Sequence, residues 1–419
     1  CAQANIALTA NQLFKNQTVR DLAHVADWKT TTSLTEEAVV HQAPFTPIQN
    51  WFFRQAGHSN FWNHELVLQA TTSLDTDRLK KALVALTARH LSLTTSFTNE
   101  YQQLTEHRSS PELLQVQLAG PSELATACAP VHESFNIAEG KLFAAVLASF
   151  QDGNADCLVL IAHHLAVDGI SWQVLTTDLE AAYAGTLDEV TTSASYLQWA
   201  SHLGSVTFEK EIPFWKGLLA QPSGALPVPT TPTVIGVIAQ HHEQLAAAET
   251  DILLHKTPQA YHTQIQDALL TALCLSLSEV YDSPHWTIDV EGHGRQHPLD
   301  DAPSIHATVG WFTTIYPVRL EAMGNNAIGT LTKTKEFLRS IPNQGFGFGS
   351  LRETQEGLRD APARQILFNY LGQLDAALST NTFANHKPLS LRRDPSLKAP
   401  YLLEINAFTH GGQLNVALD

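Results

Sequence analysis

The feature that most limits the possible folds is an uninterrupted apolar run at residues 157–162, Cys-Leu-Val-Leu-Ile-Ala, which leads directly into His163 and His164. Its length and composition are those expected of a central strand covered on both faces. Further strands are expected at residues 63–69, 113–118 and 142–150, and helices at residues 75–90, 171–183 and 196–203. The first half of the chain is therefore expected to be a sheet backed by helices.

A proline-rich stretch at residues 221–232 interrupts all periodicity, and we interpret it as the connection between two halves. The second half shows a similar pattern of expected strands and helices. Strands are expected near residues 237–245 and at residues 286–291, 309–320 and 365–371, a helix at residues 263–281, and a hairpin of residues 401–408 and 413–418. This order predicts an α/β fold of two sandwich halves, each a sheet backed by helices.

The composition excludes several classes of protein. Of 419 residues, 44% are apolar and 16% are charged, which indicates a large buried core. Lys and Arg number 25 and Asp and Glu 41, and the net charge of −16 argues against nucleic-acid binding, because that affinity rests on basic side chains. The longest apolar runs reach only about half of the roughly 20 residues that a membrane helix needs. We expect a soluble protein with neutral or basic partners and no membrane contact.

The cysteines and the start of the chain bear on its origin. Cys1, Cys128, Cys157 and Cys274 show no C-x-x-C spacing, so buried, reduced thiols in a cytoplasmic chain are expected rather than disulfides or zinc. The only methionine is Met323, and the first residues lack the basic and apolar pattern of a signal peptide, so we do not expect one to explain this start. The chain is therefore expected to be processed, or excised from a longer polypeptide.

The first group of candidate residues follows the central strand. His163 and His164 should point to opposite faces, because side chains alternate along a strand, and should do different work. An imidazole at a strand end is a candidate general base, and Asp168 is positioned to orient it or to brace the loop. The alternative is that the two histidines are a hydrogen-bonded pair, in the core or on the surface, with no catalytic role. A metal site at His164 and Asp168 would lack a third ligand.

The second group ends the strand expected at residues 286–291. Alternation places Asp289 and Glu291 on one face of this strand, and the glycines on both sides of His293 permit a sharp turn or a close approach to a ligand. A carboxylate on a solvated strand face is the alternative explanation for Glu291.

The third group interrupts the apolar strand at residues 365–371 with Asn369 and Tyr370, which can donate hydrogen bonds to a developing oxyanion. A tyrosine that anchors its ring in the core is the alternative. The Gly-Phe-Gly-Phe-Gly stretch at residues 345–349 is expected to be structural, because no Gly-Lys-Ser/Thr of a phosphate-binding loop follows it.

Together these groups closely resemble the epimerization domains of nonribosomal peptide synthetases, which are relatives of the condensation domains. Matching motifs occur in family order at residues 46–52, 163–172, 267–270, 291–295, 308–318, 342–349 and 368–373. The His-His-x-x-x-Asp-Gly stretch is shared with condensation domains. The stretches that resemble the epimerization branch are Ile170-Ser171-Trp172, Glu-Gly-His-Gly-Arg at residues 291–295, and Phe-Asn-Tyr-Leu-Gly-Gln at residues 368–373.

The chain departs from the family pattern at three places. Ala307 stands where the family often has Arg, Phe348 stands where an aromatic hydroxyl is common, and the chain ends at Asp419 where relatives continue for some tens of residues. Residues 8–23 resemble the last helices of a peptidyl carrier domain without its phosphopantetheine-bearing serine. A capping N-terminal helix is the alternative.

The resemblance implies two chloramphenicol-acetyltransferase-like lobes that meet in a V-shaped pseudo-dimer, with a tunnel for the phosphopantetheine arm of a carrier protein. The implied parts are a carrier remnant at residues 1–28, a linker at 29–43, an N-terminal lobe at 44–220, a connection at 221–232 and a C-terminal lobe at 233–419. The implied partners are an upstream carrier domain in the same polypeptide, an adenylation domain and a downstream condensation domain. As an excised domain the chain is expected to be monomeric.

The implied reaction is inversion, L to D, at the Cα of an aminoacyl or peptidyl thioester on that arm, without a cofactor or metal in the domain itself. The resemblance implies His164 and Glu291 as the opposed acid and base, Asn369 and Tyr370 as oxyanion or thioester-positioning groups, and His163, Asp168 and Arg295 as structural supports. It implies Ser171, Trp172, Trp311 and Thr313 as residues of the tunnel. Glu291 must be protonated in one direction, so burial should raise its pKa.

Two other functions stay open. A condensation-type acyltransferase would use His164 to assist attack of an amine on a thioester, and a docking module would bind a carrier without turnover. The carboxylate of Glu291 argues against the docking module. The sequence leaves open which amino acid is inverted, whether it is a lone residue or a peptide end, and which of His164 and Glu291 removes the proton of the L isomer.

Overall fold

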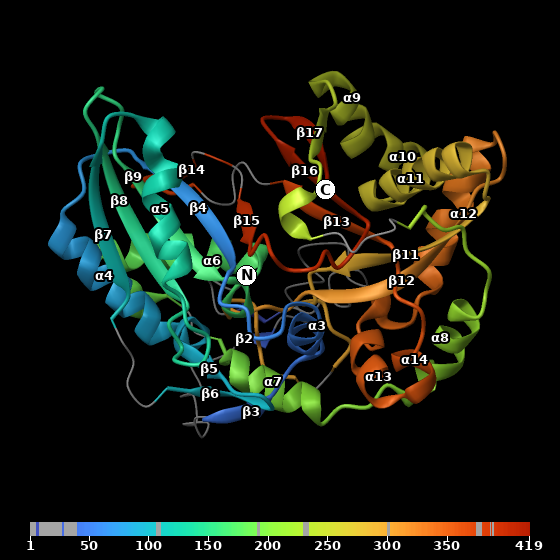
Figure 1. The fold of residues 1–419 in the computed structure, drawn as a ribbon, viewed down its shortest axis with the longest axis horizontal. Helices are drawn as coiled ribbons and strands as arrows, with labels where there is room; N and C mark the ends of the chain where they lie inside the picture. The colour runs from blue at the N-terminus through green and yellow to red at the C-terminus, as the bar shows by residue number, and fades with distance from the viewer. Residues whose placement is uncertain are drawn as a thin grey trace.

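The computed structural model describes residues 6–7, 27–28, 40–105, 110–190, 193–228, 234–299, 302–373, 379–385, 387 and 389–419. The expected carrier helices and most of the expected linker lie outside these residues. Of residues 1–28 only β1 (Ile6–Ala7) and β2 (Asp27–Trp28) are described, and they pair antiparallel. Figure 1 shows the rest as two lobes side by side, each built on its own sheet.

The sheet of the first lobe has the strand order β14-β4-β9-β8-β7, and β15 also pairs with β4. Its strands are β4 (Trp62–Ala70), β7 (Glu112–Leu118), β8 (Phe143–Phe150), β9 (Cys157–His163), β14 (Phe383–Asn385) and β15 (Ser390–Arg393). All residues of β9 are buried between β4 and β8, which confirms the central strand expected from the apolar run.

Helices cover both faces of this sheet because the side chains of its strands alternate between two cores. Leu158 and Leu160 of β9 belong to the core that α4 (Thr76–Arg89) and α6 (Gly169–Ala184) complete. Val159 and Ile161 belong to the core under α5 (Leu124–Glu133). The sandwich expected for the first half is therefore present.

The sheet of the second lobe has the order β10-β17-β16-β13-β11-β12. Its strands are β10 (His241–Gln244), β11 (His285–Gly292), β12 (Thr314–Glu321), β13 (Ile366–Gln373), β16 (Leu403–His410) and β17 (Gln413–Leu418). The helices α11 (Ile265–Tyr281) and α12 (Ala327–Ser340) lie together beside this sheet (Figure 1), and Leu270 of α11 shares a core with Ile288 and Val290 of β11.

The remaining elements connect the lobes or lie at their edges. The helices are α3 (Pro47–Ala56), α7 (Tyr196–Gly204), α8 (Ile212–Leu219), α9 (Ala247–Asp251), α10 (Thr257–Tyr261), α13 (Phe348–Thr354) and α14 (Glu356–Arg359). The strands β3 (Gln42–Pro44), β5 (Thr95–Phe97) and β6 (Tyr101–Leu104) form a small sheet. The short 3-10 turn η4 (His164–Ala166) follows β9 directly.

The second half of the sequence contributes two strands to the first lobe. The strands β14 and β15 belong to the second half of the sequence, yet they pair antiparallel with β4 in the sheet of the first lobe. The register places Arg393 of β15 opposite Trp62 and Leu391 opposite His64. A segment of the second half therefore completes the sheet of the first lobe, which the sequence patterns do not predict.

The strand expected at residues 309–320 begins only at Thr314. The backbone of the segment before it, residues 309–313, is bonded to side chains of the first lobe instead of to a strand. Ser171 Oγ accepts from Gly310 N at 3.0 Å and lies 2.9 Å from Gly310 O, and Asp168 Oδ2 accepts from Phe312 N at 3.1 Å. Backbone groups held in this way cannot join a ladder. We call residues 309–313 the crossing segment.

Several smaller expectations can be compared with the fold. The strand expected near residues 237–245 is limited to β10. Phe346 and Phe348 are buried in the core of the second lobe, which confirms a structural role for the glycine–phenylalanine stretch. Cys128 and Cys274 are buried free thiols, and burial raises their pKa to about 12 and about 11. Among the described helices, none combines the length and the apolar character needed to cross a membrane.

Candidate active site between the lobes

The two histidines at the end of β9 have separate environments, as alternation predicts. His163 is fully buried, its Nε2 donates to Ser59 O at 3.1 Å, and its Nδ1 accepts from Leu165 N at 3.2 Å. Both ring nitrogens are thus used by the backbone, and burial lowers the pKa of His163 to about 3. His163 is a neutral structural residue.

His164 begins the η4 turn and has one ring nitrogen to spare. Its Nδ1 lies 2.7 Å from Val167 O, and because a carbonyl only accepts, Nδ1 carries the proton. Its Nε2 therefore presents a lone pair, and the side chain is only partly buried. Burial lowers the pKa of His164 to about 4, against the opposing effects of the Val167 hydrogen bond and of Asp168. At neutral pH His164 is an uncharged base with a fixed tautomer.

Aromatic rings hold His164 on both sides. The centroid of the His64 ring lies 4.0 Å from that of the His164 ring, and the indole of Trp311 stacks on His164, also at a centroid distance of 4.0 Å. The indole of Trp172 stacks on His64 at 6.4 Å. We call Trp172, His64, His164 and Trp311 the ring stack. It contains residues of both halves of the sequence and limits the rotation of the His164 imidazole.

Glu291 lies near the end of β11, on the face opposite the core residue Val290. Its side chain is partly buried, and burial, with a smaller contribution from the charge of Glu404, raises its pKa to about 8. Arg393 acts in the opposite direction but is itself paired, since its Nη1 donates to both carboxylate oxygens of Glu404 at 2.9 Å. Glu291 is therefore mostly protonated at pH 7, as we expected from burial.

Arg393 connects the two candidate groups electrostatically. Its charge lowers the pKa of His164 and also lowers that of Glu291, so the guanidinium lies within electrostatic reach of both. It comes from β15, the strand of the second half that pairs with β4 of the first lobe. His164 and Glu291 thus approach one region between the lobes from two different sheets.

A second buried carboxyl lies beside Glu291. Asp289 is on the same face of β11, two residues earlier, and Tyr401 OH donates to its Oδ2 at 3.0 Å. Burial raises the pKa of Asp289, and it raises that of Tyr401 well above the ordinary value, with Asp289 and Glu291 adding to the effect. Tyr401 is therefore a neutral hydroxyl close enough to Glu291 to respond to its charge.

The structure separates Asn369 from Tyr370. In the parallel pair of β11 and β13, Asp289 is opposite Leu367 and Val290 is opposite Phe368. Alternation then places Asn369 on the face of Glu291 and Tyr370 on the other face, where it packs against the core that contains Phe368. We expected both side chains at the reacting atoms. Tyr370 instead fits the alternative of a ring anchored in the core.

Asp168, Ser171 and Arg295 form what we call the lobe crosslink. Asp168 caps the start of α6 by accepting from Ser171 N and Oγ, and its Oδ1 lies 3.0 Å from Arg295 Nη2. Arg295 also donates to Thr308 O at 2.8 Å and lies over the ring of Phe312 at 4.0 Å. The crosslink joins the loop after His164 to the loop after Glu291.

Two glycines permit the close contact of the loops at the crosslink. Gly294 has a φ of +65°, and a Cβ there would overlap the carbonyl oxygen of Phe312. A Cβ at Gly310 would overlap the ring of Tyr196. The turn expected at the glycines around His293 is thus needed to bring the crossing segment against α6 and α7.

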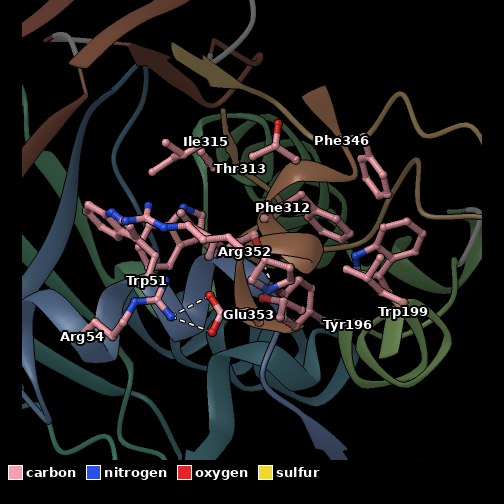
Figure 2. Close-up of a pocket in the computed structure, with 17 residues that line it drawn as sticks. Trp51, Arg54, Tyr196, Trp199, Phe312, Thr313, Ile315, Phe346, Arg352 and Glu353 are labelled. Carbon is pink, nitrogen blue, oxygen red and sulfur yellow. Dashed lines mark hydrogen bonds and ion pairs between the residues drawn. The ribbon is translucent and has the colours of Figure 1, made fainter. Parts of the chain in front are cut away.

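Of the four residues expected in a tunnel, two line a pocket and two do not. Figure 2 shows this interlobe pocket, in which Trp51 and Arg54 come from α3, Thr313 from the crossing segment, and Glu353 from α13. Trp311 and Thr313 are among its lining residues. Ser171 and Trp172 are fully buried and lie behind the site, Ser171 in the lobe crosslink and Trp172 in the ring stack.

The pocket has aromatic walls and a charged rim. Tyr196, Trp199 and Phe312 lie along it, and Arg54 Nη1 donates to both carboxylate oxygens of Glu353 at 2.6 Å (Figure 2). Trp311 separates the pocket from His164, and its buried indole N–H has no hydrogen-bond partner among the described residues. Trp311 is therefore shared by the wall of the pocket and the ring stack beside the candidate base.

The sequence patterns do not single out His64, Tyr401, Arg393 or Glu404. Asp289 lies on the expected face of its strand, but its sequence position alone indicates no role. Polar residues on the strand expected at residues 63–69 were a signal for His64. No local signal joins Arg393 to Glu404, because they meet through strand pairing across the lobes. Within the residues that the structure describes, no group of three His, Cys, Asp or Glu side chains is arranged to hold a metal ion.

Comparison with known proteins places this geometry in a family. Residues 39–419 match the family model described as the condensation domain. One component of the linear gramicidin synthase of Brevibacillus parabrevis is 35% identical over 408 residues, which are 90% of this chain and 8% of that protein. Another component of the same synthase is 31% identical over 447 residues, 99% of this chain and 9% of that protein. The chain thus spans less than a tenth of the length of these relatives.

Solved structures are similar over most of the chain. The epimerization domain from the third module of tyrocidine synthetase B superposes with a TM-score of 0.82 and 26% identity, over 91% of each chain. The condensation domain of the Monacolin K polyketide synthase MokA superposes with a TM-score of 0.71 and 18% identity, over 91% of this chain and 92% of that one, a likeness of fold. These matches confirm the expected two-lobed α/β fold and the resemblance to synthetase domains. The chain belongs to the condensation domain family.

Proposed function

We propose that this chain inverts the Cα of an aminoacyl or peptidyl thioester, L to D, while the substrate is held on the phosphopantetheine arm of a carrier protein. One observation carries the proposal. His164, a neutral imidazole with a free Nε2, and Glu291, a carboxyl group with a pKa of about 8, come from opposite lobes, and both lie within electrostatic reach of the Arg393 guanidinium. Inversion requires such a pair, because the proton leaves one face of Cα and returns to the other.

In the mechanism we propose, His164 Nε2 removes the α-proton of one isomer, the C–H electron pair forms a C=C bond, and the carbonyl π pair moves onto the thioester oxygen. The enolate that forms is then protonated on its opposite face by Glu291. The sulfur of a thioester makes the α-proton acidic enough for this step without an electron-sink cofactor. In the reverse direction the Glu291 carboxylate is the base and the His164 imidazolium is the acid. Each positioned acid or base typically contributes about 10² to 10⁴ in rate.

The residues around this pair fit the proposal. Asn369 is on the Glu291 face of the second sheet and offers an amide donor for the thioester oxygen. The lobe crosslink ties the loops that carry His164 and Glu291 to each other, which keeps the acid–base pair at a constant spacing. Tyr370 has no part in the proposed proton transfer, since it lies on the other face of β13.

We propose the interlobe pocket as the path of the arm toward His164. A phosphopantetheine arm is slender and carries two amides, and the pocket has aromatic walls with Thr313 among them. Trp311 supports this path, because it lines the pocket and also stacks on His164 at 4.0 Å.

The relatives support the wider setting of the proposal. They are components of peptide synthetases many times longer than this chain. We propose an upstream carrier domain as the partner that delivers the substrate, with adenylation and condensation domains as neighbours. The lobe boundaries proposed are residues 44–220 and 233–419, and the proposed location is the cytoplasm.

The test uses the whole chain and a carrier protein loaded with an L-aminoacyl thioester in D₂O. The expected result is D isomer that carries α-deuterium from the first turnover, while L isomer recovered early still carries protium, because the group that returns the proton is not the one that removed it. A thioester that stays L and protiated on a fully loaded carrier would refute the proposal.

Condensation is the second candidate, and the family match favours it. Its chemistry needs His164 beside the attacking amine and makes no use of a protonated carboxyl at the position of Glu291. Two loaded carriers, one as donor and one as acceptor, distinguish the functions. Dipeptide formed without α-exchange would favour condensation, and α-exchange without dipeptide would favour epimerization.

A further inference from the structure

A residue outside all of the sequence motifs lies against the candidate base. His64 is on β4, on the same face as Trp62, and its imidazole is 4.0 Å from that of His164. The strand β15 pairs beside it, with Leu391 opposite His64 and Arg393 opposite Trp62. His64 is thus on the face of the first sheet that meets Arg393 and, through it, the Glu291 region.

The tautomer of His64 is set by a neighbour that can only donate. Trp172 Nε1 lies 3.1 Å from His64 Nδ1, and an indole nitrogen has no acceptor capacity. Nδ1 therefore carries the lone pair, and the ring proton is on Nε2. No described residue accepts a hydrogen bond from Nε2, and the side chain keeps 7% of its surface exposed. A neutral histidine with a free N–H thus flanks the base.

The charge state of His64 is equally constrained. Burial lowers its pKa well below the ordinary value, and the neighbouring His164 and His163 lower it further. When His164 takes up the substrate proton, the new positive charge opposes protonation of His64. His64 therefore stays neutral throughout the proposed cycle. A neutral imidazole kept so by its surroundings can polarise a carbonyl group as a hydrogen-bond donor.

Direct proton transfer between the two histidines does not fit the geometry. An N–H···N bond between imidazoles needs ring centres about 5 Å apart, with the donor directed at the lone pair in the ring plane. The centres are 4.0 Å apart and the planes are tilted by 40°, so the rings lie closer together than such a bond allows. His164 also keeps its Nδ1 proton on Val167 O. His64 is therefore a separate donor and no relay for the base.

We propose that His64 Nε2–H donates a hydrogen bond to the thioester carbonyl oxygen and stabilises the enolate, as a further catalytic residue. This inference rests on the proposed epimerase function. In the step, the Cα–H bond breaks, the proton goes to His164, the electron pair forms the C=C bond, and the negative charge collects on the oxygen. His64 keeps its own proton. It supplies the second donor that Tyr370, on the far face of its strand, does not provide.

Three substitutions separate catalysis from support of the core. His64→Gln keeps an N–H near the position of Nε2. His64→Asn keeps an amide that can accept from Trp172 but is too short to reach the site, and His64→Leu has neither function. Loss of one oxyanion donor lowers kcat by about 10² to 10³. We expect His64→Asn and His64→Leu to lose at least 10²-fold in α-deuterium exchange, and His64→Gln to stay within about tenfold of wild type. The KM for the loaded carrier should be unchanged in all three.

The outcomes are distinct. The proposal would be overturned if His64→Leu exchanged α-deuterium within threefold of the wild-type rate. It would also be overturned if His64→Asn kept full activity while His64→Gln lost it, because that order indicates that His64 only supports Trp172. Absence of exchange in the wild-type chain would refute the epimerase function, and the role of His64 with it. Nitrogen-15 NMR of histidine-labelled chain, with His64→Gln for assignment, gives a test without substrate. A protonated Nδ1 on His64 at pH 7 would also overturn the proposal.

Discussion

Replacing Glu291 by glutamine is expected to stabilise the chain at high pH. Burial raises the pKa of this carboxyl from about 4.5 to about 8. Between these values the folded chain holds a proton that the unfolded chain has released, so the free energy of unfolding falls as pH rises. Below pH 4.5 both states are protonated, and above pH 8 both are ionised. The loss is therefore confined to the window between the two pKa values.

The size of the effect follows from the width of the window. Each pH unit inside it is worth 1.36 kcal/mol, so the full window of about 3.5 units corresponds to about 5 kcal/mol. From pH 6, just above the isoelectric point of about 5.6, to pH 9, about two units of the window are crossed. The advantage of Glu291→Gln over wild type should grow by about 3 kcal/mol across this range, because glutamine has no proton to lose.

Urea unfolding at pH 6 and pH 9, followed by tryptophan fluorescence, measures the difference. Glu321→Gln is the matched control on the same sheet, since Lys333 lowers the pKa of Glu321 and this carboxyl is ionised in both states above pH 6. Its difference from wild type should be the same at both pH values. If Glu291→Gln and wild type change in parallel, within about 1 kcal/mol, Glu291 ionises near its ordinary pKa and the reasoning that makes it a proton donor at neutral pH is refuted.

Three further results are expected. The inversion rate should be level from about pH 5 to pH 7. It should fall above pH 8 because Glu291 ionises, and near pH 4 because His164 is protonated. A profile centred on pH 6.5 would contradict the assignment of these two pKa values to the acid and the base. Gly310→Ala should destabilise the chain by about 1–3 kcal/mol, since its Cβ would overlap an aromatic ring, whereas Gly217→Ala, with open space at its Cβ, should be neutral or slightly stabilising in the same denaturation assay. Asp168→Asn should lower stability by about 3–5 kcal/mol, because it leaves a buried guanidinium unpaired; a change below 1 kcal/mol would show that the crosslink contributes little.

Much of the fold could be predicted from local patterns. The apolar run at residues 157–162 and the leucine spacing at residues 75–90 depend only on which faces are buried, and β9 and α4 correspond to them closely. The crossing segment could not be predicted. Its residues have the composition of a strand, but Ser171 and Asp168, distant in sequence, take its backbone hydrogen bonds.

The candidate site shows the same division. His164 and Glu291 carry local signals, a histidine at a strand end and a carboxyl before a glycine turn. Tyr370 carried a signal of the same kind, yet one step along β13 turns it to the other face. The partners that set the chemistry have no local signal, because Arg393 reaches the site only through the pairing of β15 with β4. Strand pairing over long separations is a property of the tertiary fold.

The two pKa values set the same pH limits for both directions of the proposed inversion. A neutral His164 with a protonated Glu291 holds the same number of protons as an imidazolium with a carboxylate. The pKa values of about 4 for His164 and about 8 for Glu291 differ by about four. The uncharged pair is therefore favoured over the charged pair by about 5 kcal/mol. In the proposed inversion, one isomer reacts with the uncharged pair and the other with the charged pair, but their transition states have equal proton counts. The same pH limits therefore apply in both directions, and the face of Cα presented to His164 alone decides which isomer is the substrate of the resting form.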